Sequence, residues 1–348
     1  MVEIRYFYTL AGLRGVAAMA VLWFHTAPFL GSQMVPFGYA AVDLFFLLSG
    51  VVIETSYGDK LRAGMPVASF FKARFVRIYP LYAVSVLFML FDILVSSGQG
   101  LFVNATALRL PIQHFSQICV MAFLGLPIWN VMDMYPLNQP AWSLFFELSA
   151  NALWVAMLPS LSTRRLQGLI VLSFAGIIAN HYYPTGNHLL DGFSRAGFSF
   201  FLGVLMARQP QRHWRRSGAA GLIIAAAILM LGLRAPPFMP PFFLWLVFVV
   251  VGFPCLVWGG MAVQPGRALR IFCQVSGNIS YPVYLLHWPL TIFCFDILAP
   301  KLHVNAADYA PWSGLGLMLG ICAAGWATDR YFDTPLRHRL MWSLRRPG

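Results

Sequence analysis

The sequence predicts an all-α, polytopic membrane protein: a bundle of about ten transmembrane helices, with eleven possible. Of its 348 residues, 59% are hydrophobic and 10% are charged, whereas soluble domains carry roughly 25% charged residues. Apolar runs of about 20 residues recur along the chain, the length that crosses a hydrocarbon core of about 30 Å. The runs are continuous and do not alternate with polar residues, which excludes a membrane β-barrel.

Each expected span is an apolar run bounded by basic, polar or Gly/Pro-containing residues. Segment 194–207 is short for the core and needs neighbouring residues to extend it. One further apolar piece, 115–130, contains Gly125 and Pro127 and is either an eleventh span or a re-entrant or short helix. In chain order the ten spans are 9–30, 37–57, 77–97, 140–160, 168–183, 194–207, 218–233, 241–261, 277–299 and 312–331.

The distribution of basic residues favours ten spans with both termini in the cytoplasm. In that arrangement 20 of the 24 Lys and Arg residues lie inside, and only Arg109, Arg195, Arg234 and Lys301 lie outside. An eleventh span at 115–130 would move Arg164, Arg165 and the 208–216 cluster outside, against the positive-inside rule. We therefore expect 98–139 to form an outer-face segment.

The net charge of +12 does not indicate nucleic-acid binding, because the arginines sit in short loops between spans and form no basic stripe interleaved with aromatic residues. The cysteines show no metal-ligand spacing, so no metal site is expected. No composition shift marks a second domain. We expect one integral-membrane domain over 1–348, with no appended soluble domain.

The first span contains two ionisable residues, Arg14 and His25. Such residues rarely face lipid and indicate a partner, a water-filled cavity or chemistry, although a packed structural histidine is the simpler alternative. With the N-terminus inside, Arg14 lies near the cytoplasmic end. His25, eleven residues further along a helix, lies about 16 Å deeper.

Asp43 lies near the outer end of the second span, and Glu147 lies in the outer half of 140–160 together with Trp142 and Ser143. His25, Asp43 and Glu147 could therefore meet at one depth from three helices. Packing or orientation is the alternative role for the two carboxylates.

Two arginines, Arg74 and Arg77, share one helix face at the cytoplasmic side. Two guanidiniums on one face suit a phosphate or pyrophosphate; a positive-inside anchor for lipid head groups is the alternative. Segment 277–299 gathers Tyr281, Tyr284 and His287 between two prolines. A structural hydrogen bond is the alternative for His287.

Six sequence motifs follow one another over nearly the whole chain. They are Leu10–Gly15 followed by His25, Asp43–Gly50, Arg74–Pro80, Trp142–Glu147, Ile279–Pro289 and Phe332–Pro335. Taken together and in this order, they resemble acyltransferase family 3, the integral-membrane acyltransferases that modify surface polysaccharides and related acceptors. In the last motif, Asp333 stands where relatives often have glutamate.

The resemblance implies about ten helices in a bacterial inner membrane and acyl transfer from cytoplasmic acyl-CoA, with acetyl-CoA the usual donor, to an acceptor at the outer face. It implies a catalytic role for His25 and a donor-binding role for Arg74 and Arg77. Arg14 is implied to assist either donor binding or the active conformation. The motif ending in Glu147 is a further functional candidate. We expect the acceptor side to involve Trp142, Ser143, Tyr281, Tyr284 and His287.

A histidine can take a proton from an acceptor hydroxyl and return it near neutral pH. His25 is therefore expected to act as the base, with Asp43 or Glu147 fixing its tautomer. A covalent acyl-His25 intermediate is an alternative route. The rival class is a transporter or flippase for a glycolipid or a polar small molecule, since the broken helices of transporters also carry polar residues. The acceptor, the acyl group and the oligomeric state are not specified by the sequence.

Overall fold

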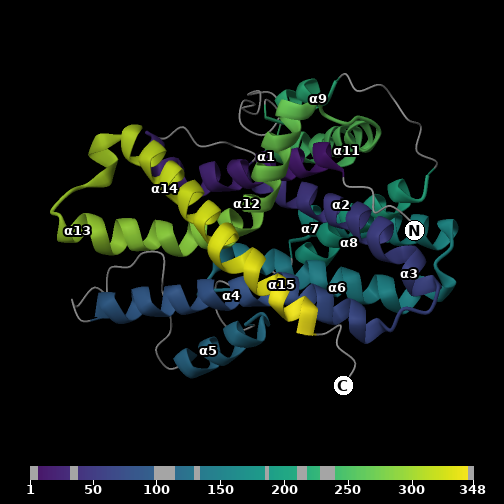
Figure 1. Cartoon of the computed structure of the whole chain (residues 1–348), viewed down its shortest axis with the longest axis horizontal. Helices are drawn as coiled ribbons and strands as arrows, with labels where there is room; N and C mark the ends of the chain where they lie inside the picture. Colours follow the sequence, from purple (N-terminus) through teal and green to yellow (C-terminus); the bar gives the residue numbers. More distant parts are fainter. Residues whose placement is uncertain are drawn as a thin grey trace. The chain divides into compact units, whose positions relative to one another are not determined.

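The computed structural model describes residues 7–31, 38–97, 114–128, 134–184, 188–209, 218–227 and 240–343. Across these ranges the chain is built from helices and their connections, which confirms the expected all-α class (Figure 1). In chain order the α-helices are α1 Tyr8–Thr26, α2 Ala41–Ile53, α3 Asp59–Arg62, α4 Val67–Ser97, α5 Phe115–Leu124, α6 Trp142–Met157, α7 Thr163–Tyr182, α8 His188–Ala207, α9 Ala219–Ala227, α10 Pro241–Val247, α11 Phe253–Ala262, α12 Arg267–Ile292, α13 Ala299–Lys301, α14 Trp312–Thr328 and α15 Thr334–Ser343.

Seven helical segments in the described ranges are long and apolar enough to cross a membrane. Of the other three expected spans, 168–183 and 312–331 contain α7 and α14, which do not meet that length and hydropathy. The third, 218–233, contains α9, and its residues 228–233 lie outside the described residues. The seven are Tyr8–Leu30, Gly38–Arg62, Val67–Val95, Gln139–Ser160, His188–Ala207, Pro241–Ala262 and Arg267–Lys301. The chain is thus a polytopic helical membrane protein.

Four helices begin before the expected boundaries. Helix α4 starts at Val67 instead of 77 and α12 at Arg267 instead of 277. Helix α7 starts at Thr163 instead of 168 and α8 at His188 instead of 194. A helix continues beyond the apolar run where its first turns carry residues that water can solvate, so hydropathy alone underestimates its length. The extension of α8 provides the length that 194–207 lacked.

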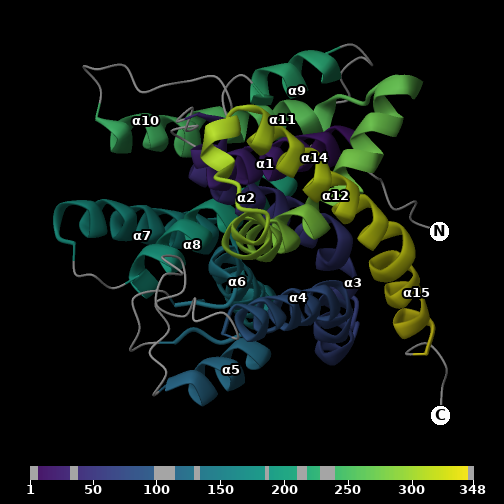
Figure 2. The ribbon, with the colours of Figure 1, turned by 90° about the vertical axis from the view of Figure 1, so that its left-hand side faces the viewer.

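The apolar piece at 115–130 contains a short helix. Helix α5 has 10 residues and ends at Gly125, whose left-handed φ of 68° is typical of a helix C-terminus. Ten residues rise only about 15 Å, too little to cross the core. The hydroxyls of Tyr79 and Tyr82 on α4 donate to the carbonyls of Phe123 and Ala122 in the last turn of α5, which lies beside α4 in both views (Figures 1 and 2).

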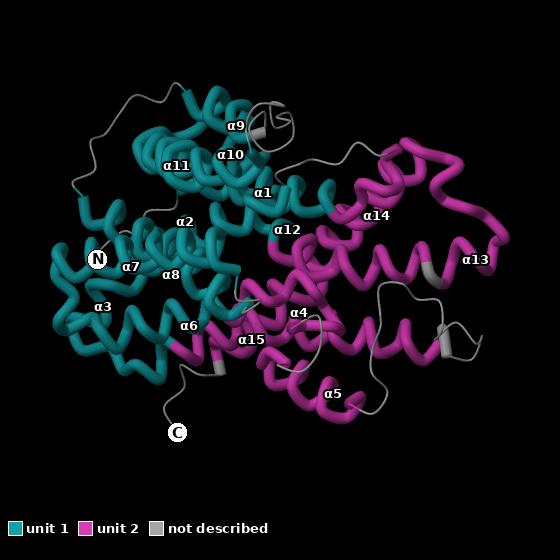
Figure 3. The backbone as a smooth tube through the Cα atoms, turned by 180° about the vertical axis from the view of Figure 1, so that it is seen from behind, with its two compact units in different colours: residues 1–24, 35–70, 146–280 teal, residues 25–34, 71–145, 281–348 magenta. Residues whose placement is uncertain are grey.

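The described helices group into two compact units, each assembled from separated parts of the chain (Figure 3). Unit 1 comprises residues 1–24, 35–70 and 146–280, and unit 2 comprises 25–34, 71–145 and 281–348. The expectation of one domain over 1–348 remains a prediction.

Unit 1 is organised around α8, which packs between α2 and α7. A Cβ at Gly50 would lie 2.0 Å from the carbonyl oxygen of Phe200, and one at Gly203 would lie 2.2 Å from that of Leu47. The two glycines therefore allow the backbones of α2 and α8 to touch, as small residues do between membrane helices.

In unit 2, α14 continues into α15 through a π-helical turn, Asp329–Asp333, so that the two appear as one long rod (Figure 1). A Cβ at Gly325 of α14 would lie 2.7 Å from Val283 of α12, which brings these two helices close together. π-Helical turns are rare and are frequent at functional sites.

The expected orientation rests partly on basic residues for which no structure is described. Arg5, Arg109, Arg212, Arg215, Arg216, Arg234, Arg345 and Arg346 lie outside the described residues, as do 98–113 and 129–133 of the segment 98–139.

Candidate functional site

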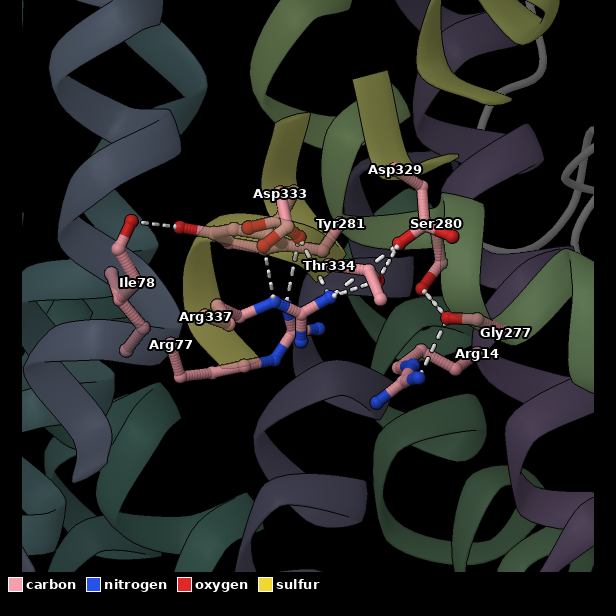
Figure 4. Close-up of polar contacts among 10 residues, drawn as sticks. All are labelled: Arg14, Arg77, Ile78, Gly277, Ser280, Tyr281, Asp329, Asp333, Thr334 and Arg337. Carbon is pink, nitrogen blue, oxygen red and sulfur yellow. Dashed lines mark hydrogen bonds and ion pairs between the residues drawn. The ribbon is translucent and has the colours of Figure 1, made fainter. Parts of the chain in front are cut away.

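Arg14 lies on α1, where small residues bring this helix against α12 within unit 1. A Cβ at Gly15 would lie 2.6 Å from Ser276, and one at Gly277 would lie 2.7 Å from Ala11. Arg14 Nη2 donates a 2.6 Å hydrogen bond to the carbonyl of Gly277 (Figure 4). The half-buried guanidinium is thus held by the backbone of α12.

His25 lies in the last turn of α1 and belongs to unit 2, where its described partner is another histidine. Its Nδ1 is 3.2 Å from Nε2 of His287 on α12, and the two ring centroids are 4.9 Å apart. The ring of Trp288 meets the His25 ring edge-on at 5.5 Å. Unit 2 therefore brings together two of the predicted site residues from opposite ends of the chain.

Arg77 is bound to an acidic residue near the end of the chain. Its Nη1 lies 3.4 Å from Oδ2 of Asp333, and its guanidinium lies over the ring of Tyr281, 4.7 Å from the centroid (Figure 4). Arg337 binds the same carboxylate at 2.9 Å. Burial raises the pKa of Asp333, while the two arginines act in the opposite direction by stabilising the charged form.

The second member of the arginine pair, Arg74, lies half-buried one turn before Arg77 on α4. The expected placement of both guanidiniums on one helix is therefore present. Since Asp333 already neutralises Arg77, a donor phosphate at this cluster would share Arg77 with a carboxylate.

The start of α6 and the middle of α12 form a hydrogen-bonded chain in unit 2. Ser143 Oγ lies 2.7 Å from the hydroxyl of Tyr284, which donates to the carbonyl of Pro140 at 2.6 Å. Ser143 Oγ also lies 3.4 Å from the Pro140 carbonyl oxygen, so either hydroxyl can be the donor of the bond between them. Trp142 is the first residue of α6 and is half-buried.

Side-chain hydrogen bonds to backbone carbonyls hold the part of α12 around His287. Pro289 has no N–H for the carbonyl of Leu285, and Asn138 Nδ2 donates to that carbonyl at 3.1 Å. The Tyr281 hydroxyl donates to the carbonyl of Ile78 on α4 at 2.5 Å. These contacts hold α12 in register next to His287.

The two predicted carboxylates lie in unit 1. Asp43 is fully buried, and its oxygens accept hydrogen bonds from Arg195 at 2.8 and 3.2 Å and from Trp245 Nε1 at 3.0 Å. Glu147 accepts a 2.7 Å hydrogen bond from Ser49 Oγ. Their expected meeting with His25 remains a prediction.

Sequence reasoning missed three charged partners. Arg195 was expected to be an outer-face charge, whereas its side chain is only 12% exposed and its guanidinium binds Asp43. Arg208 was expected to be a cytoplasmic anchor, whereas this residue binds the buried carboxylate of Glu54 at 2.8 Å. The pairing of Arg77 with Asp333 was not expected. A buried acidic residue near a span end requires a cationic partner, and that signal was present at Glu54.

The geometry defines a class: a polytopic helical membrane protein with a histidine pair inside its spans and a buried arginine–carboxylate cluster. A family model described as an acyltransferase domain, that of acyltransferase family 3, matches residues 7–328. The chain belongs to this family, as its motifs predicted, and membrane acyl transfer is its general activity.

Three curated relatives are similar to the chain, and two of them are described as a transacylase or an acyltransferase. Protein 2 of the picA locus of Rhizobium radiobacter is 38% identical over 154 residues, covering 42% of this chain and 80% of that protein. A protein described as a candidate membrane-bound transacylase, BcsY of Komagataeibacter xylinus, is 25% identical and covers 84% and 75%. The acyltransferase MdmB of Streptomyces mycarofaciens is 25% identical and covers 97% and 93%. No solved structure matches the chain.

Proposed function

We propose that this protein transfers an acetyl group from cytoplasmic acetyl-CoA to a hydroxyl of an extracytoplasmic acceptor, a cell-surface or lipid-linked glycan. The observation that carries this proposal is the half-buried imidazole of His25 at the end of a membrane helix, hydrogen-bonded to a second buried histidine. Family membership supports acyl transfer. Acetyl, the CoA donor and the glycan acceptor belong to the proposal.

In this reaction His25 removes the proton of the acceptor hydroxyl as the oxygen attacks the thioester carbonyl. The carbon–sulfur bond then breaks, and the CoA thiolate takes the proton back from the imidazolium. The products are an acetyl ester and CoA with a free thiol, so atoms and charges balance without another reactant.

The donor side would comprise Arg14, Arg74 and Arg77, whose positive charges suit the CoA phosphates. The acceptor side would comprise Trp142, Ser143, Tyr281 and Tyr284, with Asp43 and Glu147 as further catalytic candidates. The proposal places the protein in a bacterial inner membrane with both termini inside, supported by the charge asymmetry of the sequence.

Direct transfer is distinguished from an acyl-His25 intermediate by a single-turnover experiment. Purified protein is mixed with labelled acetyl-CoA in the absence of acceptor. We expect the labelled acetyl group to remain on CoA. Stable labelling of the wild-type protein that is lost in His25→Ala would reject the direct route.

The proposed reaction is tested by mass spectrometry of surface glycans from cells with and without the gene. The expected result is one sugar that is heavier by one acetyl group only when the gene is present. Inverted membrane vesicles supplied with labelled acetyl-CoA should then form the same ester. A flippase would move a glycolipid and form no ester, so the absence of label in vesicles that contain the acceptor would favour that rival.

Replacing Arg74 and Arg77 together by alanine is expected to raise the KM for acetyl-CoA at least about tenfold, because each charged hydrogen bond to phosphate contributes roughly 1.5–3 kcal/mol. The maximal rate should change less. Initial rates over a range of acetyl-CoA concentrations measure both.

Lys72→Ala is the matched control, since it removes an exposed positive charge from the same helix. Asp333→Asn is a second control, because it removes the ion pair between Arg77 and Asp333 but keeps both arginines. An unchanged KM in the double variant, or an equal increase in Lys72→Ala, would contradict a phosphate role for the arginine pair.

A further inference from the structure

We propose that His287 fixes the tautomer of His25, so that His25 carries its hydrogen on Nδ1 and directs the lone pair of Nε2 to the acceptor hydroxyl. His287 would then be a positioning residue for the reaction. This inference rests on the proposed function of His25 as a base, and it assigns to a second histidine the task that the sequence had suggested for Asp43 or Glu147.

The hydrogen position on His287 follows from its own partners. His287 Nδ1 lies 2.7 Å from the carbonyl oxygen of Tyr284 and 3.2 Å from that of Val283. A carbonyl oxygen accepts hydrogen bonds and cannot donate them, so Nδ1 of His287 carries a hydrogen. Both acceptors belong to the helix that carries the ring, so the ring orientation is set locally by α12.

The charge of His287 follows from its burial. The residue has 0% relative exposure and lies within an apolar span. Burying a cationic imidazole without a carboxylate partner is costly, and its described polar contacts are two carbonyls and a second imidazole. His287 is therefore neutral, and its Nε2 bears a lone pair.

The hydrogen position on His25 is then determined. His25 Nδ1 lies 3.2 Å from Nε2 of His287, the atom that bears this lone pair. Two facing lone pairs would repel, so the hydrogen on Nδ1 of His25 makes the bond and His25 is the donor. In a neutral His25 the other ring nitrogen, Nε2, is then the basic one. The acceptor hydroxyl, His25 and His287 would then follow one another as serine, histidine and aspartate do in a catalytic triad, with the neutral His287 in the place of the aspartate.

The carboxylates expected for this task have described contacts in unit 1. Asp43 accepts from Arg195 and Trp245, and Glu147 accepts from Ser49. A neutral acceptor stabilises the imidazolium less than a carboxylate does, because it supplies no opposite charge. The contribution of His287 is therefore mainly the choice of tautomer and the orientation of the ring.

Two substitutions of His287 separate this role from simple packing. In His287→Gln the side-chain oxygen can reach the position of Nε2 and accept from His25. In His287→Asn the shorter side chain can bind the Tyr284 carbonyl but does not reach His25. Both are uncharged and polar, and both lose the imidazole volume.

The primary measurement is ¹⁵N NMR of histidine-labelled protein in detergent, with the His25 signals identified by their loss in His25→Ala. We expect His25 to carry its hydrogen on Nδ1 in the wild type and in His287→Gln, and to shift toward the Nε2 hydrogen in His287→Asn. The kcat should fall at least about a hundredfold in His287→Asn and less than about tenfold in His287→Gln, with the KM for acetyl-CoA unchanged in both.

Several outcomes would overturn the proposal. A wild-type His25 with its hydrogen on Nε2 would do so, as would equal kcat values in folded Asn and Gln variants, judged by size-exclusion elution. If both variants fail to fold, the wild-type spectrum alone decides. Transfer that persists in His25→Ala would reject the proposed function of His25 itself, whatever the spectra show.

Discussion

Replacing His25 by alanine is expected to lower acetyl transfer at least about a thousandfold while the protein still folds. General-base catalysis contributes about 10²–10⁴-fold, and here the same imidazole also returns the proton to the leaving thiolate. Alanine has the highest helix propensity, so α1 should persist. The measurement is the rate of ester formation in inverted vesicles at saturating labelled acetyl-CoA.

His338→Ala is a suitable control for the loss of a histidine, because His338 is exposed on α15. It should retain the full rate. A His25→Ala variant that keeps more than about a tenth of the wild-type rate would show that this residue is not the base, and the proposed mechanism would then need another proton acceptor.

Replacing Asp43 by asparagine is expected to destabilise the protein by about 3–5 kcal/mol, because it removes the fully buried carboxylate that Arg195 binds at 2.8 Å. Thermal unfolding in detergent, followed by loss of the monodisperse species, measures the effect. Asp191→Asn is the control: Asp191 lies 3.8 Å from Arg195 and its side chain is 39% exposed, so its removal should cost less than about 1 kcal/mol.

A second substitution separates a structural role of Asp43 from a catalytic one. Asp43→Asn combined with Arg195→Met removes both charges and should recover most of the lost stability, since a buried ion pair can often be replaced by apolar groups at little cost. If Asp43 acts only through packing, transfer should return together with stability. A stable but inactive double variant would instead support the catalytic role.

Much of the fold could be predicted from the sequence, because a membrane-spanning helix is recognised by the apolarity of consecutive residues. Nine of the ten expected spans overlap long stretches of helix, and the described part of the tenth, 218–233, contains α9. The doubtful region at 115–130 contains a helix too short to cross. Helix ends were harder to predict: α4 and α8 begin earlier than their apolar runs, since polar first turns remain helical in water.

The candidate site was predicted as a set of residues but not as a set of contacts. The sequence singled out His25 and His287 for different tasks, and the structure joins them by a hydrogen bond across 262 positions. It singled out Arg77 for phosphate, and the structure shows Arg77 bound to Asp333. The partner of Asp43, Arg195, was counted only as a charge outside the membrane.

By itself, the sequence determined that the protein is a helical membrane protein of acyltransferase family 3, and that Arg14 and His25 share one helix. Apolarity, periodicity and motif order are properties of neighbouring residues, so they can be read without a structure. The tertiary structure alone decided which buried charge meets which partner, and which nitrogen of His25 faces His287. Those contacts depend on how helices far apart in the chain rotate and approach one another, which local sequence does not encode.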